Sequence, residues 1–88
     1  MYKYSIQIHK HVEKFLDKHT ETRVRFFSSA HIMQVNPLDS TLDITTLSGA
    51  GSDHYRLRIG KYRFLFEIVD SEVLVYFYDA GSRGDIYK

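Results

Sequence analysis

The sequence predicts an α+β domain in which one antiparallel sheet carries its helices on a single face. Apolar and polar residues alternate over residues 2–8, which is the pattern of a half-buried strand. The apolar spacing becomes helical over residues 9–35, and strand-like stretches separated by turn residues then run to the C-terminus. We therefore expect an N-terminal strand, an antiparallel helical hairpin and a three- to four-stranded antiparallel sheet.

Length and composition indicate one globular domain spanning residues 1–88. The chain is 43% apolar and 15% aromatic, which is enough for a single modest core. It contains no cysteine, so disulfides and thiolate metal sites are excluded, and we expect neither a metal nor a cofactor. No apolar run approaches the length of a transmembrane helix, and no signal-peptide pattern is present. These features predict a cytoplasmic protein with no membrane partner.

Two helices are predicted after the first strand. The first covers residues 9–18, and Thr20 is a plausible N-cap for a second helix over residues 21–35. The helical spacing predicts a buried face for the second helix at Val24, Phe27, Ala30 and Met33, with Phe26 flanking it. Asn36-Pro37 ends this helix, because proline disfavours helical geometry in the preceding residue. The histidines in or beside the helices lack metal-ligand spacing and are interpreted as surface residues: His9, His11, His19 and His31.

The remaining strands follow in order. A short strand is predicted over residues 42–47, and the glycine-rich segment 48–53 is a flexible turn, because no helix or Gly-Lys-Ser/Thr follows it as in a phosphate loop. Residues 55–66 read as two strands joined by a tight turn at Gly60-Lys61. Residues 73–79 form a nearly continuous apolar run, which predicts a central strand buried on both faces.

Three arginines are predicted to share one face of the hairpin. Along the first strand Arg56 and Arg58 point away from the apolar side, and Arg63 does so on the second. No acidic residue lies between His54 and Phe66 to neutralise them. Such a face is most often a solvated surface, but arginine also grips phosphate bidentately, which favours an anion site. The formal net charge of +1 limits any nucleic-acid contact to a local patch of this kind.

Four local motifs, taken together, are similar to those of a known protein family. They are Leu47-Ser48-Gly49, Tyr55-Arg56-Leu57-Arg58, Gly60-Lys61-Tyr62-Arg63 and the segment from Ala80 to Tyr87. Together with the element order, they resemble the RelE family of bacterial and archaeal toxins over essentially the whole chain. The resemblance implies a ribonuclease of a type II toxin–antitoxin system. Such a protein cleaves messenger RNA in the ribosomal A site, inhibits translation and is held inactive by a cognate antitoxin.

The resemblance also implies a set of site residues. The catalytic set is Arg56, Arg58, Arg63, Arg83 and Tyr87, and Lys61 joins the four arginines in binding RNA. In cleavage by 2′-hydroxyl attack, the arginines would act as clamps and electrostatic stabilisers. Tyr87 would serve either as the base or as a platform on which a nucleobase stacks, and the sequence leaves both roles open.

Two other activities remain compatible with the sequence. A ParE-like protein of the same fold would inhibit DNA gyrase, although the retained basic set argues against this alternative. A catalytically degenerate toxin would keep only antitoxin binding. That alternative is favoured by Gly81-Ser82-Arg83-Gly84-Asp85, which has no histidine where many relatives have Gly-His-Arg-Arg-Asp.

Overall fold

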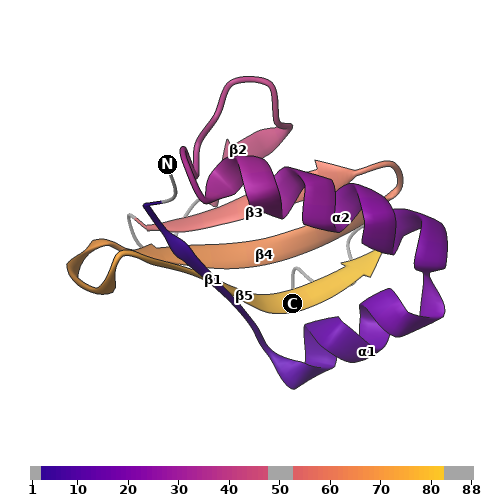
Figure 1. Cartoon of the computed structure of the whole chain (residues 1–88). Helices are drawn as coiled ribbons and strands as arrows, with labels where there is room; N and C mark the ends of the chain where they lie inside the picture. Colours follow the sequence, from indigo (N-terminus) through magenta and orange to yellow (C-terminus); the bar gives the residue numbers. More distant parts are fainter. Residues whose placement is uncertain (1–2, 48–52, 83–88) are drawn as a thin grey trace.

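The computed structural model, which describes residues 3–47 and 53–82, has two helices on one face of a mixed sheet (Figure 1). Within these residues the sheet has five strands in the order β1-β5-β4-β3-β2. The elements in chain order are β1 (Ser5–Ile8), α1 (Lys10–Lys18), α2 (Thr20–Met33), β2 (Ile44–Thr46), β3 (His54–Ile59), β4 (Tyr62–Val69), the short 3-10 helix η1 (Asp70–Glu72) and β5 (Leu74–Ser82). The predicted fold class and element order are confirmed.

The first strand gives the sheet its mixed character. β1 pairs with β5 in parallel, with Ile6 opposite Val75, whereas the other neighbouring strands are antiparallel. A parallel pair needs a long crossover connection, and here the two helices and the later strands supply it. The four strands after the helices agree with the prediction, and β1 adds a fifth at the edge (Figure 1).

The core lies between the helices and the covered face of the sheet. Its centre consists of four fully buried phenylalanines: Phe26, Phe64, Phe66 and Phe77. The ring of Phe26, on α2, lies 4.8 Å from the rings of both Phe64 and Phe77, measured between centroids. Burying a phenylalanine side chain contributes about 1.5–3 kcal/mol, so this cluster holds α2 on the sheet. Val12 and Leu16 bring α1 into the same core.

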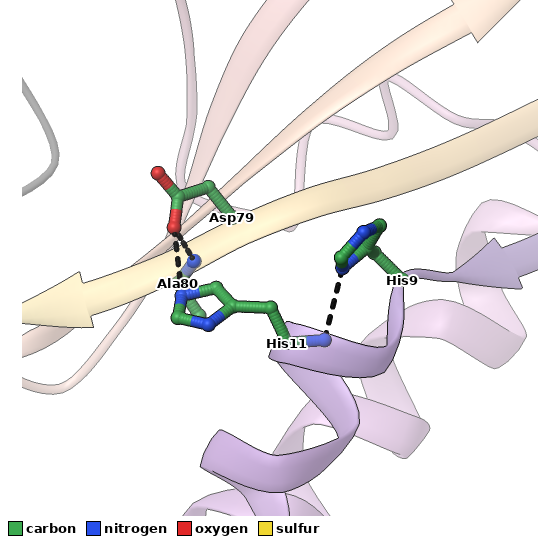
Figure 2. A network of polar contacts seen from close by, with 4 residues as sticks. All are labelled: His9, His11, Asp79 and Ala80. Carbon is green, nitrogen blue, oxygen red and sulfur yellow. Dashed lines mark hydrogen bonds and ion pairs between the residues drawn. The ribbon is translucent and has the colours of Figure 1, made fainter.

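Polar contacts fix the start of α1 against β5, as Figure 2 shows. Nδ1 of His9 accepts a hydrogen bond of 2.9 Å from the backbone N–H of His11, which makes His9 the N-cap of α1. Nε2 of His11 lies 3.1 Å from Oδ1 of Asp79 on β5. The same carboxylate oxygen accepts the N–H of Ala80 at 2.8 Å. His9 and His11 therefore have structural partners although they lie at the surface.

The predicted orientation of α2 is wrong in part. Val24 and Phe27, expected in the core, are 70% and 44% exposed, whereas Phe26, expected to flank the buried face, is fully buried. The buried positions are Phe26, Ala30 and Met33, whose spacing of four and three residues follows one face of a helix. Apolar residues occur on several sides of α2, so periodicity does not decide which side faces the sheet.

The junction between the helices also differs from the prediction. His19, not Thr20, occupies the N-cap position of α2, and Thr20 is its first helical residue. The His19 ring stacks on Phe15 with centroids 4.2 Å apart, and its Nδ1 lies 2.7 Å from the carbonyl oxygen of Phe15. His19 is therefore half-buried, in contrast to the surface position expected for it.

Neither helix in the described ranges combines the length and apolar character that a membrane crossing demands.

The burial of the inner strands differs from the expected pattern as well. β5 is an interior strand, but its buried residues alternate with half-buried ones such as Tyr76. The central position belongs to β4, where Phe64, Leu65 and Phe66 are buried in succession. The apolar run over residues 73–79 therefore includes tyrosines that line the uncovered face of the sheet. The predicted glycine-rich turn lies outside the described residues, except for Asp53.

Candidate functional site

The β3–β4 hairpin places three arginines on the uncovered face of the sheet. Gly60 opens the connecting turn with a φ of 60°, as the first position of a two-residue type II′ turn requires. The resulting register sets Arg58 directly opposite Arg63 and Arg56 opposite Leu65. Leu57, which pairs with Phe64, points to the core, so its neighbours on β3 point to the other face. We call the side chains of Arg56, Arg58 and Arg63 the arginine face.

Arg63 carries the clearest sign of an unmet interaction. Its side chain is half-buried, and its Nε atom is buried without a hydrogen-bond partner in the described part of the chain. Buried donors in native proteins are nearly always paired, so an exception points to a ligand, a water or a partner. Arg63 also faces Arg58 across the strand pair, and like charges in directly opposed positions destabilise a sheet. A bound anion would relieve both conditions.

An acidic residue does neutralise part of this face, contrary to the sequence-based expectation. Nε of Arg58 lies 2.7 Å from Oδ2 of Asp43, and both side chains are about half exposed, at 52% and 49%. The backbone N–H of Arg58 also donates to the carbonyl oxygen of Asp43 at 2.9 Å. Asp43 precedes β2, and the pairing of β2 with β3 brings it alongside Arg58. A guanidinium has five N–H donors, so Arg58 keeps donors for a further anion.

Arg56 is positioned by its neighbours on β2 and β4. Its Nη2 donates to Oγ1 of Thr45 at 3.4 Å, and Thr45 is its registered partner on β2. On the other side it faces Leu65, which is only 6% exposed although it lies on the uncovered face. The arginine face is therefore partly dry, which strengthens electrostatic interactions relative to a fully solvated surface.

The uncovered face continues beyond the arginines with two further groups, His54 and Tyr78, that were not among the predicted site residues. His54 is two residues before Arg56 on β3 and so lies on the same face, opposite Glu67. Nδ1 of His54 is 3.0 Å from the hydroxyl oxygen of Tyr78, on β5. Burial, and then the nearby carboxylates of Glu67 and Asp79, raise the pKa of Tyr78 above its ordinary value. The alternation of His54 with Arg56 and Arg58 was the sequence signal for this extension.

Of the other predicted site residues, Lys61 is the one that the structure describes, and it does not join the arginine face. Nζ of Lys61 lies 5.6 Å from the ring centroid of Tyr62. That ring contacts Phe15 and His19, at centroid distances of 5.2 Å and 4.7 Å, so Lys61 is directed toward the helices. Arg83 and Tyr87 lie outside the described residues, and the roles expected for them stay predictions.

A second surface lies on the outer side of α2. It is a shallow depression of about 600 Å³ lined by Arg23, Val24, Phe27, Ser28 and His31, which we call the α2 surface. The guanidinium of Arg23 lies 5.4 Å from the ring centroid of Phe27, within the range of a cation–π contact. Exposed apolar side chains grouped in this way are typical of a surface that contacts another protein.

Comparison with known proteins links this architecture to solved structures. The sequence matches no family profile and no curated protein. The RelE–RelB complex from the archaeon Pyrococcus horikoshii aligns with 94% of this chain and 98% of its own, at a TM-score of 0.80 and 29% identity. The RelB–RelE antitoxin–toxin complex from Methanococcus jannaschii aligns with 92% of this chain and 94% of its own, at a TM-score of 0.66 and 25% identity. The isolated RelE toxin of E. coli, at 15% identity and a TM-score of 0.60 over 96% of this chain and 90% of its own, shares the fold.

Proposed function

We propose that this chain, as a member of the RelE family, is the toxin of a toxin–antitoxin pair. In this proposal the protein inhibits translation by cleaving messenger RNA. The similar archaeal proteins were crystallised as RelE with RelB, which supports a protein antitoxin as the partner here. The observation that carries the ribonuclease part of the proposal is the opposed pair of Arg58 and Arg63, with Arg56 beside it on the same face.

The arginine face has the properties of a phosphodiester site. Two guanidiniums in opposed positions repel each other when no ligand is bound. A phosphate bound between them would attract both. The unpaired Nε of Arg63 offers a donor that protein groups in the described residues leave unused. The net charge of +1 is too low for general nucleic-acid binding, so recognition would rest on this patch.

The proposed reaction uses the RNA's own 2′-hydroxyl as the nucleophile. Its oxygen attacks the adjacent phosphorus while the bond to the 5′-oxygen breaks, which leaves a 2′,3′-cyclic phosphate and a 5′-hydroxyl. Guanidiniums of Arg56, Arg58 and Arg63 stabilise the charge that grows on the phosphate oxygens. They do not serve as bases, because the pKa of arginine exceeds about 12. Arg83 and Tyr87 are proposed to complete the site, and the reaction calls for no cofactor.

The ribosome fits this proposal as the place of cleavage. An RNA held in the A site is already ordered, so the protein need not supply the whole entropic cost of alignment. A few arginines on a nearly neutral protein bind free RNA weakly, especially at physiological salt. Cleavage of ribosome-bound message is therefore expected to exceed cleavage of the same RNA in solution, and the protein is expected to act in the cytoplasm.

The α2 surface is proposed as part of the antitoxin-binding area. An amphipathic antitoxin segment would cover Val24 and Phe27 with its apolar side and place acidic residues near Arg23. Burying these exposed side chains would favour binding, because apolar area removed from water contributes about 25 cal/mol per Å². Since the antitoxin would bind only the folded toxin, it should also raise the toxin's melting temperature.

Translation in a purified system tests the function directly. The protein is added to a ribosome-bound message, and primer extension then maps the 5′ ends of the fragments. We expect cuts within the reading frame, and fewer cuts in the same message without ribosomes. Intact message at a dose that stops translation would contradict the proposal, and inhibition of DNA supercoiling by gyrase would then identify the ParE-like alternative.

A further inference from the structure

His54 and Tyr78 form a hydrogen-bonded pair at one end of the arginine face. The contact of 3.0 Å joins Nδ1 of His54, on β3, to the hydroxyl of Tyr78, on β5, across the intervening strand β4. Tyr78 lies where the β4–β5 register shifts, between the partners of Leu65 and Phe66, so an extra residue of β5 occupies this position. Bulges of this kind redirect a side chain, and here the result is a tyrosine that reaches the histidine.

The proposed reaction requires a group that accepts a proton near neutral pH, and the arginines do not meet this requirement. The other four histidines lie away from the arginine face: His9 caps α1, His11 contacts Asp79, His19 stacks on Phe15 and His31 lines the α2 surface. Among the histidines, all of which lie in the described residues, only His54 shares the uncovered face with the arginines. It lies two strand positions from Arg56, a spacing of about 7 Å, which suits a phosphate and its neighbouring 2′-hydroxyl.

We propose that His54 is the catalytic base of this site and that Tyr78 is the positioning residue that fixes its tautomer; the inference rests on the proposed ribonuclease function. With Nδ1–H donating to the tyrosine oxygen, the lone pair of Nε2 takes the proton of the 2′-hydroxyl. The 2′-oxygen bonds to phosphorus, and the 5′-oxygen leaves with a proton from water. The imidazolium then returns its proton to the hydroxide that this step produces.

The surroundings of the pair support this assignment. Glu67 is the registered partner of His54 on β4 and of Tyr76 on β5, so its carboxylate is available to stabilise an imidazolium. The hydroxyl of Tyr78 is neutral near pH 7 because its ordinary pKa is 10.0, and burial and the carboxylates of Glu67 and Asp79 raise that pKa further; the oxygen of this neutral hydroxyl is the acceptor for Nδ1–H in the proposed tautomer. Arg56 and Asp53 are the charged neighbours of His54 on its own chain segment. The tyrosine thus has the orienting role that a carboxylate has in a Ser-His-Asp triad.

The test measures single-turnover cleavage of ribosome-bound message across pH 6 to 8, using the full chain. Histidine is the side chain whose ordinary pKa falls in this interval, so the wild-type rate should rise with pH to a plateau. His54→Gln should cleave about 10²–10⁴-fold more slowly, the usual contribution of general acid–base catalysis, and should lose the rising limb. Tyr78→Phe should slow cleavage by about tenfold, as expected for one lost hydrogen bond, and should shift the limb without weakening RNA binding.

His9→Asn is the matched control, because it removes a surface histidine while asparagine keeps a good N-cap. It should cleave at the wild-type rate, whereas His54→Gly should regain activity when imidazole is added. A flat wild-type profile would overturn the inference without any variant, and so would His54→Gln cleaving at the wild-type rate. Intact message with the wild-type protein would instead overturn the proposed function itself, and this inference with it.

Discussion

The arginine face and the α2 surface differ both in chemistry and in how far the sequence anticipates them. The arginine face is cationic, partly dry and held by strand register, with Arg58 set opposite Arg63. The α2 surface is apolar and exposed, with Val24 and Phe27 turned to solvent on the helix side of the sheet. Strand alternation has a period of two and assigns the arginines without ambiguity, whereas α2 has apolar residues on more than one side.

This difference suggests that the two surfaces serve two partners. The cationic arginine face, where Nε of Arg63 is unpaired in the described residues, suits a polyanion. The shallow, apolar α2 surface suits a protein partner. Because one lies on the uncovered face of the sheet and the other on the helices, a change in one should leave the other intact (Figure 1).

The orientation of α2 predicts opposite outcomes for two adjacent phenylalanines. Phe26→Ala should lower the free energy of unfolding by about 3–5 kcal/mol, because it empties a fully buried position in the core. Phe27→Ala should change it by about 0.5 kcal/mol, as is usual at the surface, since Phe27 is 44% exposed. Chemical denaturation of both variants measures this difference. Equal losses would mean that the two faces of α2 are not distinct.

Within the arginine face, Arg63 should matter most. Arg63→Ala should slow cleavage of ribosome-bound message by about 10²–10³-fold, the cost of removing one preorganised donor to a developing oxyanion. Arg58→Ala should have a smaller effect, because Nε of Arg58 is already bound to Asp43. Single-turnover rates give the ranking, and Lys14→Ala, on the exposed side of α1, is the control. A larger loss for Arg58→Ala than for Arg63→Ala would show that the ion pair with Asp43 does not reduce the contribution of Arg58 to cleavage.

The α2 surface should affect antitoxin binding alone. Phe27→Ala is expected to weaken binding of the cognate antitoxin by about 2 kcal/mol, the scale of an aromatic anchor at an interface. Its cleavage rate in the absence of antitoxin should equal that of the wild-type protein. Calorimetric titration with purified antitoxin measures the first quantity, and primer extension the second. Unchanged affinity would remove the α2 surface from the antitoxin interface.

Removing the carboxylate of Asp43 should make the arginine face more cationic and so increase its difference from the apolar α2 surface. Asp43→Asn breaks a half-exposed ion pair, so the free energy of unfolding should change by about 0–1 kcal/mol. Arg58 would then engage RNA fully. The slope of log affinity against log salt for single-stranded RNA should steepen by at most about 0.7, the value for one additional neutralised phosphate. A slope that stays constant would indicate that Arg58 makes the same RNA contacts with and without Asp43.

The smallest expected effect concerns the pH dependence of folding at Tyr78. Burial raises the pKa of its hydroxyl above the ordinary value of 10.0, with Glu67 and Asp79 adding to the shift. The native state therefore holds this proton more tightly than the unfolded chain does. The associated stability is fully present below pH 10.0 and is lost as pH rises through the higher native pKa. Melting temperatures above pH 10.0 should fall less steeply for Tyr78→Phe than for the wild-type protein.

The sequence by itself determined the features that depend on local pattern. The alternation along residues 54–59 and 62–68 fixed which side chains share a face, and Gly60 supplied the positive φ of the turn. The element order followed from the change of period, although α2 ends at Met33, before the end at Val35 that Asn36-Pro37 predicted. For this reason the arginine face was predicted correctly in its composition, although not in its charge balance.

Only the tertiary structure decided which distant segments meet. Strand pairing brings Asp43 to Arg58 across 15 positions of sequence, and the register shift on β5 brings Tyr78 to His54. The fit of Phe26 among the phenylalanines of β4 and β5 selects the buried side of α2 and leaves Phe27 outside. These choices depend on packing and register between segments far apart in the chain, to which a local pattern of polar and apolar residues does not respond.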